Sequence, residues 1–357
     1  TATICSGGAT DIVLRSTVPS TNFAWTVSDS PAVTWTSAPA DGSRVNGNNT
    51  SIAQTLAHTA SSPTTVTYAI IPAGPAPTNC PGPEITRTVV VNPSAQVNDP
   101  ANQMHCAGTA VPALSFTTNR TGGTTTYEWL NDNTAIGLGA SGSGNLPAFT
   151  ATNSGTAPIT ATITVIPIFT NGGQSCSGTP QTFTITVNPS AQVNDPADQV
   201  QCNNASVPEL VFTTTRTSGT TTYAWTNSNT SIGLGASGSG NLPAFTATNS
   251  GTAPISATIT VTPTFTNGGQ SCSGTPQTFT ITVNPSAQVN DPADQVQCNN
   301  ASVPELVFTT TRTSGTTTYA WTNSNTSIGL GASGSGNLPA FTATNSGTAP
   351  ISATITV

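Results

Sequence analysis

Cysteine is the residue type in this sequence whose spacing most clearly predicts chemistry. The chain has seven cysteines. One pair in each repeat, at a regular spacing of 70 or 75 residues, predicts a disulfide framework that forms in an oxidising compartment. The expected pairs are Cys5–Cys80, Cys106–Cys176 and Cys202–Cys272. Cys298 is left without a partner, since a cysteine at the same spacing would lie beyond Val357.

A metal site is the alternative use of these cysteines. Structural zinc sites draw on closely spaced cysteines or on cysteine with histidine. The sequence has no Cys-x-x-Cys pattern, and its two histidines, His58 and His105, have no counterparts in the later repeats. The residues therefore favour disulfides over zinc.

Acidic residues at the junctions between repeats are a second candidate site. Asp195 and Asp198, with their copies Asp291 and Asp294, offer the hard oxygen ligands that Ca²⁺ takes. The first junction has Asn102 in place of the second acid, and two acids supply few of the six or more ligands of a calcium shell. The other interpretation is an Asp-Pro turn with solvated carboxylates. No other cofactor is expected.

The remaining polar residues do not assemble into a recognisable catalytic set. The repeat at 188–283 has three acids, one arginine and no histidine. It offers no pairing of a nucleophile with a base and no set of phosphate ligands. The Gly-rich segment 233–241 does not join a strand to a helix, so a phosphate loop is not expected. We predict that the chain is not an enzyme.

Charge is scarce, and this limits the kinds of partner. Only 5% of residues are charged, the net charge is −7, and all six basic residues are arginines. The absence of a basic cluster argues against nucleic acid and against anionic membrane surfaces. No apolar run is long enough to span a bilayer, so we expect no membrane insertion.

An internal repeat sets the domain organisation. The string Asn-Pro-Ser-Ala-Gln begins at Asn92, Asn188 and Asn284, which gives a period of 96 residues. Residues 284–357 repeat residues 188–261 letter for letter. We predict a divergent module at 1–91, full modules at 92–187 and 188–283, and a module at 284–357 that is truncated before its last strand. Because the chain opens in mid-pattern, we expect a piece of a longer protein.

Each module has the pattern of half-buried antiparallel strands. In the third module, apolar and hydroxylic residues alternate through 221–225, 255–265 and 279–283, between Gly-rich turns. About 90 residues of short strands predict a two-sheet sandwich. We expect its core to hold one tryptophan per module: Trp25, Trp129, Trp225 and Trp321. Trp35 lies outside the repeated pattern and is the candidate for an exposed contact.

Four motifs together resemble a known family. They are Tyr-x-Trp-Thr-Asn-Ser, Gly-Asn-Leu-Pro-Ala-Phe-Thr, Thr-Ile-Thr-Val-x-Pro and Cys-Ser-Gly-Thr-Pro-Gln-Thr-Phe. Residues 92–357, and more distantly 1–91, resemble the PKD-like, immunoglobulin-like repeats of very large bacterial surface proteins exported by type IX secretion. Gliding adhesins and extracellular adhesive filaments are among these proteins. The resemblance implies an all-β fold of tandem immunoglobulin-like (PKD-like) β-sandwich modules in an elongated array, at the bacterial cell surface.

The expected function is structural. We predict a stalk or shaft of a cell-surface adhesin or extracellular filament, which gives reach and mechanical support for attachment. The expected partners are other modules of the same protein, including a homo-oligomer or a domain-swapped filament. The alternative is an adhesin module that binds a glycan or a cell surface through loops such as 233–241.

Overall fold

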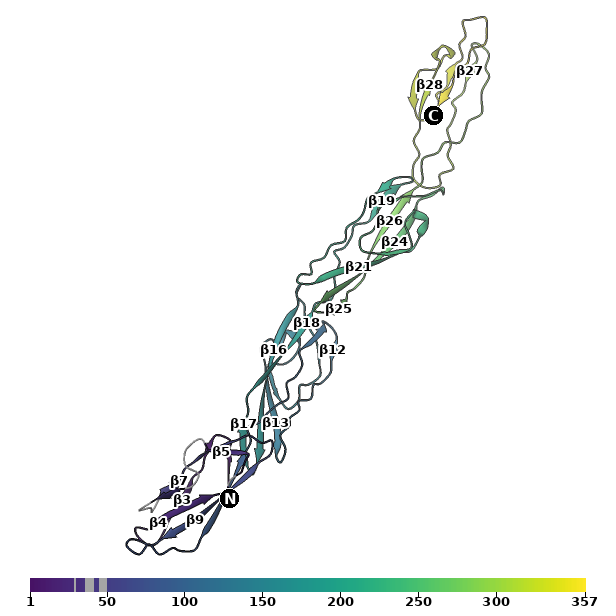
Figure 1. Ribbon diagram of the computed structural model, residues 1–357. Coiled ribbons are helices and arrows are strands. Elements are labelled where there is room, and N and C mark those ends of the chain that lie inside the picture. The colour runs from purple at the N-terminus through teal and green to yellow at the C-terminus, as the bar shows by residue number, and fades with distance from the viewer. Residues whose placement is uncertain (29, 36–41, 45–49) are drawn as a thin grey trace. The chain divides into compact units, whose positions relative to one another are not determined.

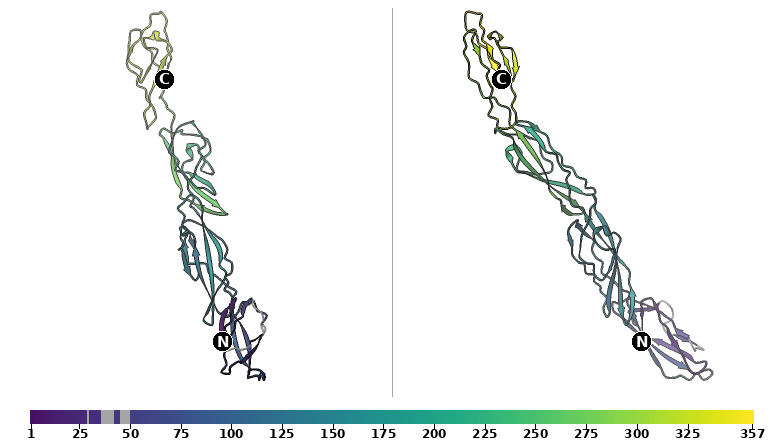
Figure 2. Two further views of the ribbon diagram at one scale, coloured as in Figure 1. Left: turned by 90° about the vertical axis from the view of Figure 1, so that its left-hand side faces the viewer. Right: turned by 180° about the vertical axis from the view of Figure 1, so that it is seen from behind.

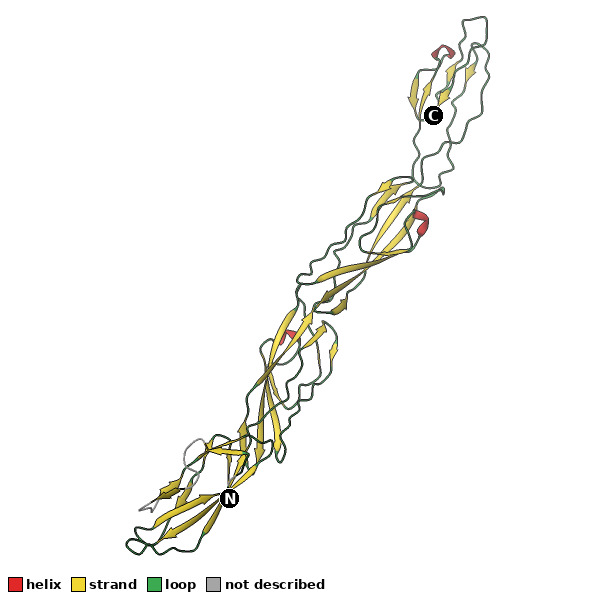
Figure 3. Ribbon diagram, in the orientation of Figure 1, coloured by secondary structure: helices red, strands yellow, loops and turns green. Residues whose placement is uncertain are grey.

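The computed structural model describes residues 1–28, 30–35, 42–44 and 50–357. It is all-β, with several β-sandwich modules in tandem, and within these residues the helices are single 3₁₀ turns between strands (Figure 3). Figure 1 labels the strands along the ribbon. By its internal contacts the chain forms two compact units. One contains residues 1–190 with 216–220 and 266–272, and the other contains 191–215, 221–265 and 273–357. We keep the word module for the four predicted residue ranges.

The second module shows the sandwich most fully. Its larger sheet has the order β11-β18-β16-β13-β14, and β17 adds to the end of β16. The facing layer is a short pair, β12 with β15, next to an isolated bridge between Leu114 and Leu146. The bounds are β11 Gln103–Cys106, β12 Ala110–Val111, β13 Thr124–Asn131, η1 Thr134–Ile136, β14 Ser141–Ser143, β15 Phe149–Thr150, β16 Ile159–Asn171, β17 Gln174–Ser177 and β18 Gln181–Asn188.

The first module has the same main sheet, in the order β1-β10-β9-β4-β6, faced by two smaller sheets, β2-β8-β5 and β3-β7. Its first strand contacts β17 of the second module. Figure 2 shows the same ribbon from two further sides. The bounds are β1 Ala2–Cys5, β2 Gly8–Ala9, β3 Ile12–Leu14, β4 Asn22–Val27, β5 Val33–Trp35, β6 Gly42–Arg44, β7 Thr50–Ile52, β8 Thr55–His58, β9 Thr64–Ala73 and β10 Ile85–Asn92.

The third module repeats the second, and the fourth has fewer strands. The third contains β19 Gln199–Cys202, β20 Ser206–Val207, β21 Thr220–Asn227, η2 Thr230–Ile232, β22 Ser237–Ser239, β23 Phe245–Thr246, β24 Ile255–Asn267, β25 Gln270–Ser273 and β26 Gln277–Asn284. The fourth contains β27 Ser302–Val303, β28 Ala320–Asn323, η3 Thr326–Ile328, β29 Ser333–Ser335, β30 Phe341–Thr342 and β31 Ile355–Thr356.

The long strands form where the sequence alternates between apolar and hydroxylic residues. Along β16 every second side chain from Ala161 to Phe169 is buried, so one face of this thirteen-residue strand lies in the core. The four tryptophans predicted to lie in the cores are buried, each with 7% or less of its surface exposed: Trp25, Trp129, Trp225 and Trp321. The segment 233–241, by contrast, is less of a loop than predicted, because β22 lies within it and pairs with β21.

Trp35 is not the exposed residue that the sequence suggested. It is half-buried at the end of β5, packs against the core of the first module, and meets the Tyr68 ring edge-on with the ring centroids 6.4 Å apart. Its position outside the repeated pattern reflects the divergent core of the first module. The Tyr68 hydroxyl donates to Gln54 Oε1 at 2.8 Å, and burial raises the pKa of Tyr68 to about 12.

The third and fourth modules give an internal comparison, because residues 188–261 and 284–357 are identical. In the third module, β19 pairs parallel with the last strand, β26. The same residues in the fourth module, 295–298, have no such partner within 284–357 and form no strand. Val296 is accordingly 96% exposed, against 68% for Val200.

Among the described residues, no helix has the length and apolar character needed to cross a membrane.

A glycine beside the core tryptophan is expected to be essential for packing. A Cβ on Gly142 would lie 2.7 Å from Cε2 of Trp129, so Gly142→Ala must displace the indole and should cost about 1–3 kcal/mol of local stability. Hydrogen exchange of the β13 and β14 amides measures this loss. Gly139→Ala is the matched control, since a Cβ there meets nothing within 4 Å. Equal protection in the two variants would contradict this account of the core.

Candidate functional site: the joint between modules

The register of the first and last strands places a cysteine beside an asparagine at one end of each sandwich. The strands β1 and β10 run parallel with Cys5 opposite Asn92, and β11 and β18 run parallel with Cys106 opposite Asn188. Cys202 lies opposite Asn284 in the same way. We call this the exit end, because the chain leaves the module there. Cysteine and asparagine of each pair therefore reach the exit end together.

The second cysteine of each of the first three modules lies at the opposite end, which we call the entrance end. In the second module Cys176 pairs with Phe169, near the end of β16. Cys106, by contrast, is adjacent to Asn188, one residue past the pairing of Val187 with Ile159 at the start of β16. Ten residues of strand correspond to about 33 Å. A disulfide requires its Cα atoms to be roughly 4.4–6.8 Å apart, so these two cysteines cannot pair.

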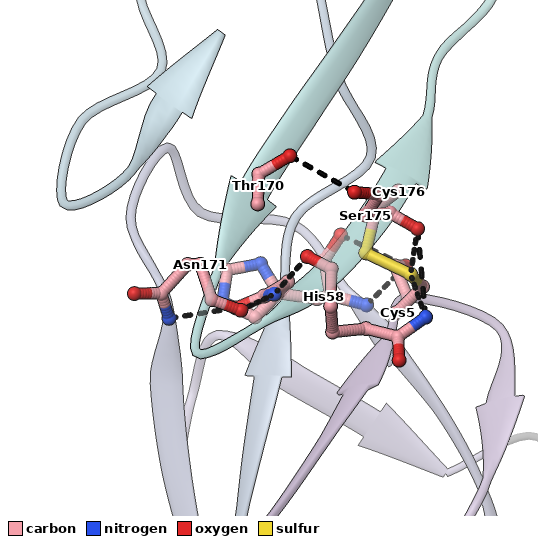
Figure 4. Close-up of a disulfide and its surroundings, with 9 residues drawn as sticks. Cys5, His58, Thr170, Asn171, Ser175 and Cys176 are labelled. Atoms are coloured by element: carbon pink, nitrogen blue, oxygen red, sulfur yellow. Dashed lines mark hydrogen bonds between the residues drawn. A yellow bond between two sulfur atoms is a disulfide. The ribbon is translucent and has the colours of Figure 1, made fainter.

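The disulfides therefore join neighbouring modules, and the predicted pairing within modules is wrong. Cys5 bonds to Cys176, and Cys106 bonds to Cys272, each with a Cα–Cα distance of 5.5 Å. Figure 4 shows the first of them, which fixes the end of β1 to the β16–β17 hairpin. The predicted pairs Cys5–Cys80, Cys106–Cys176 and Cys202–Cys272 are all replaced. Cys80, Cys202 and Cys298 remain as exposed thiols.

Two asparagine amides form a reciprocal clamp next to the disulfide. Asn92 is fully buried, and its Nδ2 donates to the carbonyl oxygens of Asn171 at 3.0 Å and of Gln174 at 3.4 Å. Asn171 Nδ2 donates back to Asn92 Oδ1 at 3.0 Å. The same bonds recur between Asn188 and the hairpin at Asn267. Both halves of the clamp lie in repeated motifs, Asn-Pro-Ser-Ala-Gln and Asn-Gly-Gly-Gln.

An arginine makes a third contact on the neighbouring module. Arg120 donates from Nη1 to the carbonyl of Ala60 at 3.1 Å, and the Thr121 amide donates to Ser61 O at 3.0 Å. Arg216 and Arg312 repeat this arrangement, since each donates from Nη1 to a glycine carbonyl of the preceding module. The only basic residue of the repeat is thus a joint residue. Because the acceptor is a backbone carbonyl, this arginine needs no acidic partner.

Close approach of the linker requires glycine after the hairpin cysteine. A Cβ on Gly178 would collide with the carbonyl oxygen of Ala95, and Gly274 has the same relation to Ala191. The linker also contributes to the module that follows it, because Val97 and Val193 are buried in the second and third cores. The spacing Cys-Ser-Gly is therefore needed to let the linker lie against the hairpin.

His58 lies beside the first joint (Figure 4). Its side chain is almost fully buried, and its Nε2 lies 2.9 Å from Thr64 Oγ1. Its backbone amide donates to Ser6 Oγ at 2.8 Å, next to Cys5. Burial, with the added charge of Arg120, lowers the pKa of His58 below its ordinary value of 6.5. The imidazole is therefore neutral in the folded joint near neutral pH.

One of the junction acids has a partner within its own module. Asp198 accepts a hydrogen bond from the Thr280 amide, which holds the pKa of its carboxyl below its usual value. Asn102 makes the equivalent bond to Thr184 at 2.8 Å, so an uncharged amide serves equally well. In the part of the chain that the structure describes, no three His, Cys, Asp or Glu side chains gather to hold a metal. Asp195, Asp291 and Asp294 belong to no such group.

The sequence found the cysteines but not their partners, and it missed the amide clamp and the arginine. The repeated Asn of the linker motif and the Asn-Gly-Gly-Gln turn were both visible as invariant letters of the repeat. The first motif indicates only the repeat period and the second only a turn, because nothing in one module shows which groups of the next module it contacts. Chemically, the assembled groups can hold two modules together, and the only covalent chemistry they offer is thiol–disulfide exchange.

Replacing Asn92 by Asp is expected to weaken the first joint. The change removes the Nδ2 donor and turns a carboxylate oxygen toward the carbonyls of Asn171 and Gln174 in a buried site, at a cost of about 1–3 kcal/mol or more. Hydrogen exchange of the β16–β17 hairpin should speed up accordingly. Asn284→Asp is the control, since Asn284 has the same place in its module and is only half-buried. Unchanged hairpin protection in Asn92→Asp would refute the clamp.

Acid is expected to destabilise the first joint through His58. The folded pKa lies below the unfolded value of 6.5, so the unfolded chain binds the proton more readily. The stability of the folded state is therefore complete above pH 6.5 and decreases as the pH falls below it. Chemical denaturation of the wild type and of His58→Gln between pH 7.5 and 5 measures this. The variant should lose less stability than the wild type over this range, and parallel losses would exclude His58 as the cause.

Comparison with known proteins identifies one module. Residues 2–95 match the PKD-like domain family. No curated protein matches the chain. Among solved structures, mouse cadherin-23 repeats EC22–24 are 8% identical with a TM-score of 0.33, over 80% of this chain and 95% of that one. The human desmocollin-1 ectodomain is 10% identical with a TM-score of 0.26, over 96% and 72%. The chain is thus a set of tandem β-sandwich repeats whose first module is similar to the PKD-like domain.

Proposed function

We propose that this chain is a structural repeat region, a stalk or shaft, of a large bacterial cell-surface adhesin or extracellular filament. The observation that carries the proposal is the joint. The disulfide, the amide clamp and the arginine contact recur at successive joints and hold one module to the next. A protein whose modules acted independently would need none of these contacts, since modules in one chain move relative to each other by default.

The cellular setting is consistent with this role. Disulfide-bonded repeats of this kind are typical of extracellular proteins, because thiols stay reduced in the cytosol. Modules of the PKD-like type are typically non-catalytic, and placement at a bacterial surface is part of the proposal. Glycan recognition by residues 233–241 has less support, because the middle of this segment is a strand of the main sheet.

A stalk must keep its modules extended in solution. The test is small-angle X-ray scattering with light scattering on the oxidised full chain. Strands of this length give roughly 30–40 Å per module, so four modules should reach a maximum dimension above about 120 Å. An extended monomer supports a single-chain stalk, and an extended oligomer that survives dilution supports a multi-chain shaft. A compact particle, with modules folded back on each other, would overturn the proposal.

A further inference from the structure

The two disulfides overlap along the chain. Cys106 lies within the loop that Cys5–Cys176 closes, and Cys176 lies within the loop that Cys106–Cys272 closes. The shortest covalent path from Thr1 to Val357 therefore does not follow the backbone through the linkers. It runs to Cys5, across to Cys176, backwards to Cys106, across to Cys272, and on to Val357. This path contains only about 160 residues, and each spans at most about 3.5 Å.

We propose that the disulfides, rather than the peptide linkers, carry tension from module to module and set how far the chain can extend. This inference rests on the proposed stalk function and adds the mechanical element to it. Each joint has two covalent connections in parallel, the linker and the disulfide. Of the two, the disulfide directly connects folded strands, whereas the linker residues 93–102 form no strand.

Because of where its two cysteines lie, tension acts on the second module in the direction of its strands. Tension enters at Cys176 in β17, at the entrance end, and leaves at Cys106 in β11, at the exit end. Between them lie the β16–β18 ladder, with seven residue pairs, and the parallel β11–β18 ladder, with four. Ladder hydrogen bonds lie across the strands. A pull along the strands strains all of them together in shear, rather than opening them one at a time.

The same arrangement protects the weakest strand. The four-residue strand β11 lies at the edge of the main sheet and pairs with it through β18. Cys106 is its last residue, and its disulfide anchors it to the next hairpin. A force that would peel β11 away is thus transmitted onward instead.

Single-molecule stretching of the full chain, held at its two ends, tests the proposal. The oxidised chain should stop lengthening at a contour of about 56 nm, against about 125 nm after reduction. Cys5→Ser should add only about 11 nm and Cys106→Ser only about 9 nm, because the remaining disulfide still bypasses most of the chain. The double variant should add about 69 nm, far more than the sum.

This non-additivity is the signature of overlapping disulfides. If the disulfides formed within modules, each single variant would lengthen the contour by about 25 nm. The double variant would then lengthen it by the sum of the two. Cys80→Ser and Cys202→Ser are matched controls that should leave the contour unchanged, since both residues are free thiols. Additive increments, or an oxidised contour near that of the reduced chain, would overturn the proposal.

The outcome separates the mechanical inference from the stalk function. A chain that is extended in scattering but stretches to its full contour when oxidised is a stalk whose load runs through the linkers. A compact chain that shows the short contour and the non-additive variants keeps the overlapping disulfides and loses the stalk.

Discussion

Parallel pairing of the first and last strands of a module is the constraint on which the joint depends. Because β1 and β10 run in the same direction, the end of the first strand and the end of the last strand arrive at one end of the sandwich. Cysteine on the first strand and asparagine on the last then face the following module side by side. Antiparallel pairing of these two strands would place that cysteine at the other end and would permit the disulfide within the module. One choice of strand direction therefore decides the covalent topology.

A strand of this fold can be predicted from the sequence when the pattern that specifies it lies within the strand or its adjoining turn. Alternation over five or more residues predicted β21, β24 and β26, and the Asn-Gly-Gly-Gln turn predicted the hairpin between β24 and β25. The alternation did not predict β22, which lies in the Gly-rich segment 233–241, nor did it predict β19 and β25. The latter two strands are four residues long and contain the cysteines. The position of β19 depends on its pairing with β26, about 80 residues away along the chain. The position of β25 depends on the hairpin turn that pairs it with β24. No local pattern encodes such pairing.

The site was less predictable than the fold for the same reason. A spacing of 70 residues within a module and a spacing of 166 residues between modules are equally regular in a repeat of 96. The pairing at a spacing of 70 residues is excluded only by the length of the thirteen-residue strand, which keeps the two cysteines of one module at opposite ends. Trp35 differs from its prediction for a similar reason: it has no counterpart in the repeats, and the divergent core of the first module, against which it packs, is not visible in the repeat pattern.

The joint also explains how so uncharged a chain specifies its contacts. With 5% of residues charged, ion pairs cannot set the register of one module on the next. Paired amides do so instead, because a buried amide with both donor and acceptor satisfied accepts few alternative partners, and leaving either group unpaired is costly. Arginine adds a hydrogen bond that it donates to an uncharged backbone carbonyl, so no acidic partner is required. Salt screens such contacts much less than it screens pairs of exposed charges.

Separation of the two cysteines within a module also protects against mispairing. A repeat protein with identical cysteines at every 96 residues offers many wrong disulfides to an unfolded chain. Once a module folds, its two cysteines are fixed at opposite ends, about 33 Å apart, and neither can reach the other. Only docking of the next folded module brings a strand cysteine within bonding distance of a hairpin cysteine. The amide clamp and the disulfide are made in the same docked arrangement, so the non-covalent contacts of the joint favour the same cysteine pairing that the disulfide fixes.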